Sequence, residues 1–92
     1  MYKISQYSRN KAKMLGVMIK PSTRKNKKID VYDKQNNYIT SIGDIRYKDF
    51  PTYLKENGTE YANKRRLLYK KRHQKHRIIV GSSSYYADKI LW

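Results

Sequence analysis

The 92-residue sequence contains no cysteine. This absence excludes a disulfide framework, a zinc site built from thiolates and a cysteine nucleophile. No stretch approaches the roughly 20 apolar residues that a membrane-spanning helix needs. The opening residues, Met-Tyr-Lys-Ile-Ser-Gln, lack the apolar segment of a secretory signal. We therefore expect a soluble, intracellular protein.

Acidic residues are scarce as well. Seven Asp and Glu residues stand against 22 Lys and Arg, which gives a formal net charge of +15 and a pI near 10.1. The charge is spread along the chain, since residues 1–58 contribute +8 and residues 59–92 contribute +7. A pI above about 9 on a small domain is typical of nucleic-acid-binding proteins. Solubility alone needs a net charge magnitude of only about 2 to 8.

Large aliphatic side chains are few, and ten of the hydrophobic residues are tyrosines. A single domain of this length buries only about 60 to 65% of its unfolded surface. Because tyrosine keeps its hydroxyl near water or a polar partner, we expect a thin core with most tyrosines at its edge. The alternative is that some tyrosines stack on the bases of a single strand.

Residues 64–77 carry eight Lys and Arg in fourteen positions and no acid. The segment has no Gly or Pro and consists mostly of good helix formers, which predicts a basic helix. Such a helix is favoured beside dense negative charge, because each neutralised phosphate releases condensed counterions. Nucleic acid is therefore the first candidate partner, and an anionic membrane is the second. The alternative is a solvated helix face whose long side chains cover a thin core.

Two basic segments, this helix and the loop at residues 24–28, supply the candidate nucleic-acid-binding residues. Arginine in particular can contact phosphate through two parallel hydrogen bonds. The candidates are Arg24, Lys25, Lys27, Lys28, Lys64, Arg65, Arg66, Lys70, Lys71, Arg72, Lys75 and Arg77. The loop could instead be merely solvated or act as an import signal.

Metal binding and catalysis find little support in the sequence. His73 and His76 have a spacing that suits a metal, but the surrounding positive charge repels a divalent cation. The only conceivable acidic cluster is Asp30, Asp44 and Asp49, and turns or helix caps explain these residues better. There is no Gly-rich phosphate loop and no nucleophile elbow. We predict no metal, no cofactor and no enzymatic activity, with a metal-dependent nuclease as a remote alternative.

The order of helix formers, strand formers and turn residues predicts an α+β fold in a single domain over residues 1–92. Residues 1–22 are predicted to contain a helix that begins after Ser5 and ends at Gly16, followed by an extended segment. Residues 29–43 alternate apolar and polar positions around a turn rich in Asp and Asn, which predicts a β-hairpin.

Residues 49–92 are predicted to form a helical part. Asp49 is expected to cap a short helix whose first turn contains a proline. Thr59 is expected to cap the long basic helix, which should extend to His76 or Arg77.

The last segment is predicted to complete the core. Residues 78–80 are expected to form a strand or a buried extended segment, and residues 84–92 a final short helix or turn. Because the segment closes on Ile-Leu-Trp, which is apolar, we expect this terminus to dock into the core rather than to fray.

Five segments are distinctive when taken together. They are Lys-Lys-Ile-Asp-Val-Tyr-Asp at 27–33, Ser-Ile-Gly-Asp-Ile at 41–45, Tyr-Lys-Asp-Phe-Pro-Thr-Tyr-Leu at 47–54, Glu-Tyr-Ala-Asn-Lys-Arg-Arg-Leu-Leu-Tyr-Lys-Lys-Arg-His at 60–73 and Ser-Tyr-Tyr-Ala-Asp-Lys-Ile-Leu-Trp at 84–92. Together they resemble a family of small basic proteins of unassigned function encoded by nucleocytoplasmic large DNA viruses, the giant viruses. The resemblance implies no activity and no catalytic residues. It does imply a protein that neutralises or organises packaged DNA, or that lies in the virus particle.

We therefore expect sequence-nonspecific binding of nucleic acid, above all double-stranded DNA, through phosphate contacts. Genome compaction or packaging is the expected role. The alternative is a structural virion protein that cements other components by binding acidic protein surfaces, and a homo-oligomer is compatible with either. The expected location is the infected host cell, in the virus factory, cytoplasm or nucleus, and the virion.

Overall fold

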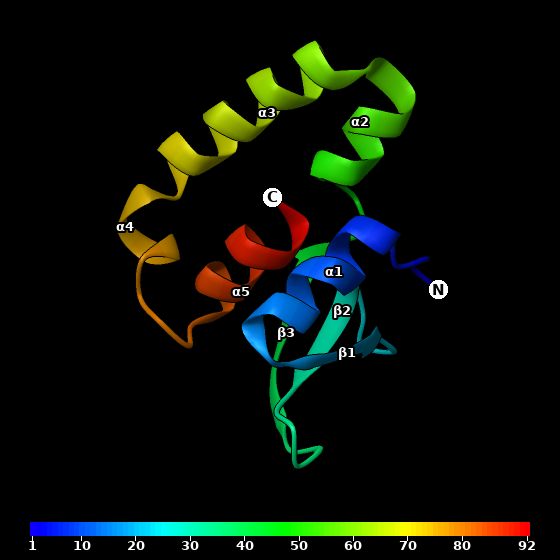
Figure 1. Ribbon diagram of the computed structural model, residues 1–92, viewed down its shortest axis with the longest axis vertical. Helices are drawn as coiled ribbons and strands as arrows, with labels where there is room; N and C mark the ends of the chain where they lie inside the picture. The colour runs from blue at the N-terminus through cyan, green and yellow to red at the C-terminus, as the bar shows by residue number, and fades with distance from the viewer.

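Five helices and a three-stranded antiparallel sheet make up the fold in the computed structural model, which describes residues 1–92 (Figure 1). The elements in chain order are α1 (Gln6–Leu15), β1 (Met18–Pro21), β2 (Lys27–Tyr32), β3 (Tyr38–Asp44), α2 (Phe50–Asn57), α3 (Thr59–Arg72), α4 (Gln74–Arg77) and α5 (Ser83–Leu91). The strands lie in the order β1-β2-β3. The predicted α+β fold is thus confirmed.

The N-terminal segment forms as its sequence predicts. The Ser5 hydroxyl accepts a hydrogen bond from the backbone N–H of Ser8 at 3.1 Å and caps α1. Gly16 ends the helix with a φ of +74°, a left-handed conformation that glycine adopts without a steric penalty. The Ser8 hydroxyl then donates to the carbonyl of Ile90 at 2.9 Å. This bond ties α1 to the C-terminal helix.

Strands β2 and β3 form the predicted hairpin. The Asp33 carboxylate accepts two backbone N–H groups of its own turn at 2.9 Å each, which is the usual way that Asp stabilises a tight turn. The register places Ile29 opposite Ile42, and both side chains are fully buried. Strand β2 begins at Lys27, so the expected loop at residues 24–28 contributes its last two residues to the sheet.

The core lies between the sheet, α1 and α5. Its buried members are Ile4, Ala12, Ile29, Val31, Ile42, Ile90 and Leu91. Figure 1 shows α1 and α5 together against the sheet, with the C-terminus below α3. Because Ile90 and Leu91 are almost fully buried and Trp92 packs against the same cluster, the docked C-terminus is confirmed.

A close approach between β3 and α5 depends on Gly43. A Cβ atom at this position would lie 2.8 Å from Leu91 Cδ1 and 2.9 Å from Lys28 Cδ. The residue also has a φ of +77°, which disfavours any side chain. Glycine therefore lets the C-terminal helix pack directly on the strand.

The other helices extend away from this core. We call residues 50–82, which contain α2, α3 and α4, the helical arm, and the remaining elements the core half. Asp49 caps α2 as predicted, because its carboxylate accepts the backbone N–H of Thr52 at 3.1 Å. Figure 1 shows α3 passing above α5, from α2 at one end to α4 at the other.

Two predictions about the long helix are wrong. Thr59 is the first residue of α3 rather than its cap, since Gly58, with a φ of +87°, already turns the chain into the helix without a side-chain hydrogen bond. The helix also does not extend unbroken to His76 or Arg77. It is interrupted at His73, where the backbone leaves the helical region, and the single turn of α4 follows. Arg77 folds back across this break, and its Nε donates to the carbonyl of Lys70 at 3.2 Å.

The prediction for residues 78–80 is also wrong. These residues lie in a turn, and their side chains are 54 to 79% exposed. The chain must reverse here to bring α5 back onto the core. The reversal ends where the Ser82 hydroxyl caps α5 by accepting the backbone N–H of Tyr85 at 3.1 Å.

Candidate nucleic-acid interface

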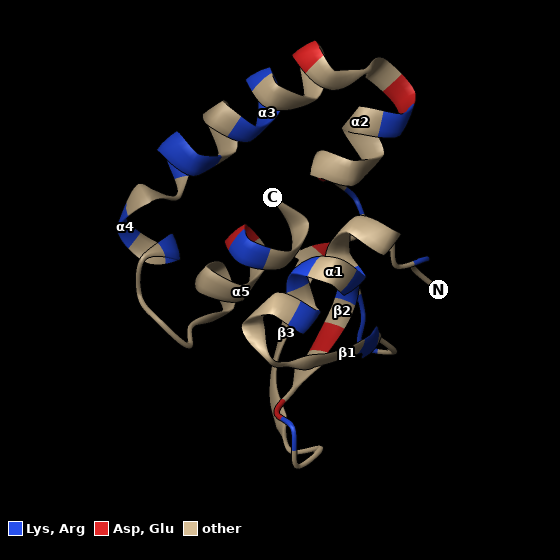
Figure 2. Cartoon of the chain, in the orientation of Figure 1, with Lys and Arg blue, Asp and Glu red and all other residues tan.

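Basic residues recur in the helical arm from the end of α2 through α3 to α4 (Figure 2). The arm carries only two acids, Glu56 and Glu60, and both lie at the corner between α2 and α3. Glu56 is already paired with Lys48 at 2.6 Å. From residue 61 to the end of α4, the chain has no carboxylate to neutralise its cations.

Most acids elsewhere are paired as well. Asp44 and Arg46 form an exposed pair at 2.6 Å, and the hydrogen bonds from Arg46 lower the pKa of Asp44 to about 2. Only six of the 22 Lys and Arg side chains have a carboxylate partner. The surface therefore keeps a large unpaired positive charge.

Six of the twelve predicted residues are exposed and have no carboxylate partner. They are Lys25, Lys27, Lys64, Lys71, Arg72 and Lys75. Lys64 and Lys71 are seven residues apart and lie on the same side of α3. This side of α3 combines basic and apolar side chains, because the exposed Leu67 and Leu68 lie between the two lysines.

Lys28 does not belong to an exposed surface. Its side chain is 5% exposed, and its Nζ lies 2.8 Å from the Oδ2 atom of Asp49. The Tyr2 hydroxyl donates to the same oxygen at 2.6 Å, and burial together with this bond raises the pKa of Tyr2. Burial opposes the charge of Asp49, but the Lys28 ammonium and the hydrogen bonds from Lys28, Thr52 and Tyr2 outweigh it and lower the pKa of Asp49. Contact with phosphate would leave this carboxylate buried and unpaired, so we exclude Lys28 from the interface.

Lys70 and Arg77 are held by Asp88 of α5. The Asp88 carboxylate is 1% exposed and lies 2.7 Å from Lys70 Nζ and 3.8 Å from Arg77 Nη1. These contacts join the chain on both sides of the break at His73 to the core half. Lys70 and Arg77 therefore position the helical arm, and the sequence alone gave no sign of this role.

Three other predicted arginines lie over aromatic rings. The distances from Cζ to the ring centroid are 4.4 Å for Arg24 over Tyr38, 5.3 Å for Arg65 over Tyr53 and 4.0 Å for Arg66 over Phe50. Arg24 is additionally 3.9 Å from Asp30. Cation–π contacts of this kind hold an arginine in place while leaving part of its guanidinium free to donate hydrogen bonds.

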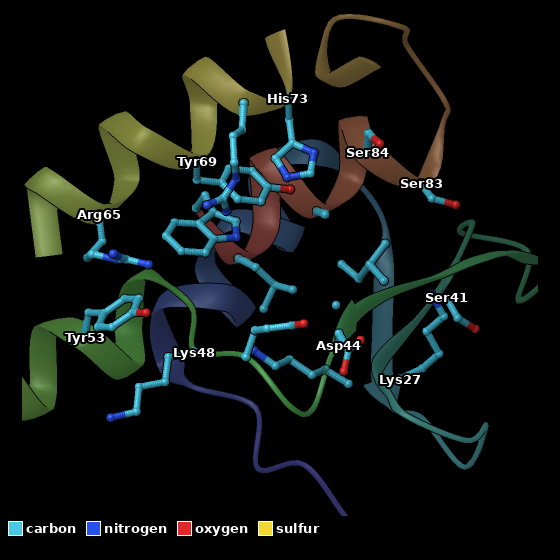
Figure 3. A pocket seen from close by; sticks show the side chains of 18 residues that line it. Lys27, Ser41, Asp44, Lys48, Tyr53, Arg65, Tyr69, His73, Ser83 and Ser84 are labelled. Atoms are coloured by element: carbon cyan, nitrogen blue, oxygen red, sulfur yellow. The ribbon is translucent and has the colours of Figure 1, made fainter. Parts of the chain in front are cut away.

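A cavity of about 630 Å³ lies between α3 and the core half (Figure 3). Arg65, Tyr69 and Arg72 line it from one side of α3, and Lys27 and Asp44 line it from the sheet. The sequence does not predict this cavity, because its walls come from several separate stretches of chain. The one available signal was the recurrence of basic and aromatic residues at 65, 69 and 72.

Aromatic rings are stacked at this cavity. The ring of Tyr69 stacks on Trp92 with a centroid distance of 4.3 Å and an angle of 8°, and His73 stacks on Tyr69 at 4.3 Å. Burial and the nearby Asp88 raise the pKa of Tyr69 to about 12. Burial and the charge of Arg72 lower the pKa of His73, which favours its neutral imidazole. The rings of the stack thus favour their uncharged forms, although cations surround them.

The acidic and histidine side chains form no group of three that could hold a metal ion. None of the helices combines the length and the apolar character needed to cross a membrane.

Comparisons with protein-family models, curated proteins and solved structures give no match. The resemblance to a giant-virus family stays a prediction. The candidate interface is defined by the charge and geometry of this chain.

Proposed function

We propose that this protein binds nucleic acid without sequence preference, with double-stranded DNA as its main partner. One observation carries the proposal: exposed cations without carboxylate partners recur along the helical arm and on the adjacent β2 side, whereas most acids are already paired. Binding of such a surface to a phosphate backbone is favourable, because it releases condensed counterions.

The chemistry of the exposed side chains supports nonspecific binding. Lys64, Lys71 and Lys75 present flexible point charges, which suit phosphates and carry no information on base identity. The six exposed and unpaired residues named above would neutralise about six phosphates. Lys70 and Arg77 contribute indirectly, because their contacts with Asp88 fix the position of the helical arm.

We extend this proposal to the biological role that the sequence resemblance implies. A protein with a net charge of +15 would offset part of the repulsion between packed DNA segments in a large DNA virus. In this proposal the protein is a binding protein rather than an enzyme, and it acts in the infected cell or the virion.

A titration of labelled duplex DNA, duplex RNA and single strands at several salt concentrations tests the proposal. With about six phosphates neutralised, log affinity for duplex DNA should fall with log salt at a slope of roughly −5. Fluorescence anisotropy measures this slope directly. A flat salt response, or no binding at low salt, would contradict the proposed function.

A second candidate is contact with an acidic protein surface, as in a cementing virion protein. The observation that favours it is the turn at residues 78–80, where Ile78, Ile79 and Val80 are exposed next to the cations of α4. Exposed apolar side chains beside basic ones are common at protein interfaces. Nuclease treatment separates the candidates, because it should release a nucleic-acid-bound protein from its complexes and leave a protein-bound one in place.

A further inference from the structure

The cavity below α3 has the size and polarity of a small-ligand site. Its volume of about 630 Å³ falls within the roughly 300 to 1,000 Å³ of pockets that hold small molecules. Apolar and aromatic side chains alternate there with a few cations and hydroxyl groups. Figure 3 shows the Arg65 guanidinium beside the Tyr53 ring, with Tyr69 and His73 farther along α3.

Arg65 has an unused hydrogen-bonding group at this site. Its Nε atom is buried and has no hydrogen-bond partner. A buried donor without an acceptor is unfavourable and rare in folded proteins. The guanidinium lies over the Tyr53 ring, which fixes its plane and keeps it at the cavity. A small movement of the guanidinium toward an anion in the cavity would give this donor an acceptor.

The charge at the cavity also favours an anion. Arg65, Arg72 and Lys27 line it and have no carboxylate partner, whereas the lining carboxylate of Asp44 is already held by Arg46 at 2.6 Å. A cleft lined by one sign of charge concentrates ions of the opposite sign. A phosphate is therefore better matched to this cavity than a neutral or cationic group.

The aromatic side chains supply the second part of the site. Trp92 is half-buried and lines the cavity, with one ring face against Tyr69 and its centroid 6.2 Å from that of Tyr53. Aromatic rings within a basic groove are the means by which proteins bind unpaired bases. A base within a duplex cannot use such rings, because its two faces are covered by its neighbours.

We propose that this cavity binds one unpaired nucleotide of a single-stranded nucleic acid. The base would lie against Tyr53 and Trp92, and the phosphate would accept hydrogen bonds from Arg65 and Arg72. This inference rests on the proposed nucleic-acid binding and adds a second binding mode to it. Exposed lysines of the helical arm contact duplex phosphates, and the cavity binds an unpaired nucleotide at a gap, end or bubble.

The chain provides its own probe for this site. Trp92 is the only tryptophan, so emission excited at wavelengths that the ten tyrosines do not absorb reports on the cavity. The experiment titrates the full chain with an oligothymidylate of about eight nucleotides, an abasic strand of the same length and a blunt duplex. Binding is followed by anisotropy of the labelled nucleic acid and, in parallel, by Trp92 emission. We expect the oligothymidylate to quench the emission and the duplex to bind without quenching. The abasic strand should bind about tenfold more weakly than the oligothymidylate, without quenching.

Two substitutions test the assigned contacts. Arg65→Gln keeps helix propensity and should weaken oligothymidylate binding by about tenfold while changing duplex binding by less than about twofold. Tyr53→Leu should also weaken strand binding by about tenfold, through the lost stacking. The matched control is Lys64→Gln, which removes the neighbouring charge on the exposed side of α3 and should lower strand and duplex binding by the same factor.

The outcomes separate the two proposals. If strand and duplex both fail to bind, the proposed function and this inference are both wrong. If both bind but the oligothymidylate leaves Trp92 emission unchanged, the cavity proposal is overturned and the proposed function stands. The cavity proposal is also overturned if Arg65→Gln and Tyr53→Leu, folded by circular dichroism, bind the oligothymidylate as the parent does.

Discussion

Aliphatic side chains fill the centre of the core half, whereas aromatic rings and ion pairs hold the helical arm in place. In the core half, Ile29, Val31 and Ile90 are fully buried. In the helical arm only Phe50, Ala62 and Tyr69 are buried, and Leu67 is 71% exposed. Burial of aliphatic surface gives the core half most of its stability, while the helical arm depends on a few specific contacts.

The thin packing of the helical arm means that a bound polyanion should stabilise the folded chain. The helical arm combines the strongest concentration of cations with the thinnest packing, so repulsion among its side chains opposes the compact state. Contacts with Asp88 offset part of that repulsion at Lys70 and Arg77. A polyanion would offset the rest, and any ligand that binds only the folded chain stabilises it by mass action.

The largest expected effect is at the junction of the two regions. Asp49→Asn removes the charge that pairs with the buried Lys28, but it keeps a good helix cap for α2. An unpaired buried ammonium should then reduce the free energy of unfolding by about 3 to 5 kcal/mol. Urea denaturation at pH 7 measures the loss. A change below about 1 kcal/mol, as for a surface pair, would show that the pair is not buried in solution.

The same pair should make stability depend on pH. The pKa of Asp49 is lower in the folded protein than in the unfolded chain. Its contribution is therefore complete above the unfolded value of about 3.9 and is lost as the pH falls through the lower, folded value. Repeating the urea titration from pH 6 downward should show a shallower loss for Asp49→Asn than for the parent. Parallel curves would rule out this role for Asp49.

A pair of leucine substitutions sharpens the comparison between the two regions. Leu91→Ala opens space in the core half and should cost about 2 to 5 kcal/mol. Leu67→Ala is the matched control in the helical arm and should change stability by no more than about 0.5 kcal/mol, because that side chain is largely exposed. Equal losses in thermal or urea unfolding would mean that Leu67 is covered in solution, for example by a second copy.

A smaller effect is expected where the helical arm meets its own aromatic residues. Arg66 lies over the Phe50 ring and donates to the Asn63 side chain at 2.8 Å. Arg66→Gln should destabilise the protein by about 1 kcal/mol or less. Arg9→Gln on α1 removes an equal charge from an exposed site without such contacts, and its melting temperature should match that of the parent. If the two variants melt alike, the ring contact contributes nothing.

The sequence predicts most of the local structure, because local signals determine it. Ser5 and Gly16 set the ends of α1, and Asp49 caps α2, through bonds that span only a few residues. The hairpin likewise follows from alternation and from the turn at Asp33. Signals of this kind do not depend on the rest of the fold.

Most of the features that the sequence did not predict depend on distant partners. Residues 64–77 read as one uniform basic helix, yet Asp88 draws Lys70 and Arg77 inward. The sequence likewise places Lys28 in a basic loop, whereas the fold buries its side chain against Asp49. Charge composition identifies the basic surface, but only tertiary contacts show which cations are free to bind. Our candidate interface therefore retains about half of the residues that the sequence suggests.

The most direct test of the central claim compares two variants with the same net charge. The arm variant replaces three exposed lysines of the helical arm, Lys64, Lys71 and Lys75, with Gln. It leaves Arg66 and Lys70 in their structural contacts. The matched control changes Lys3, Lys13 and Lys34, three exposed lysines of the core half, to Gln. Circular dichroism establishes that both variants are folded.

Duplex DNA binding is then measured against salt for the parent and both variants. For the arm variant we predict a slope that falls from roughly −5 to roughly −3 and an affinity loss on the order of 100-fold near 0.15 M salt. For the control we predict the parent slope and a loss of less than about tenfold. Equal slopes and equal losses in the two variants would contradict the claim that the helical arm is the nucleic-acid-binding region.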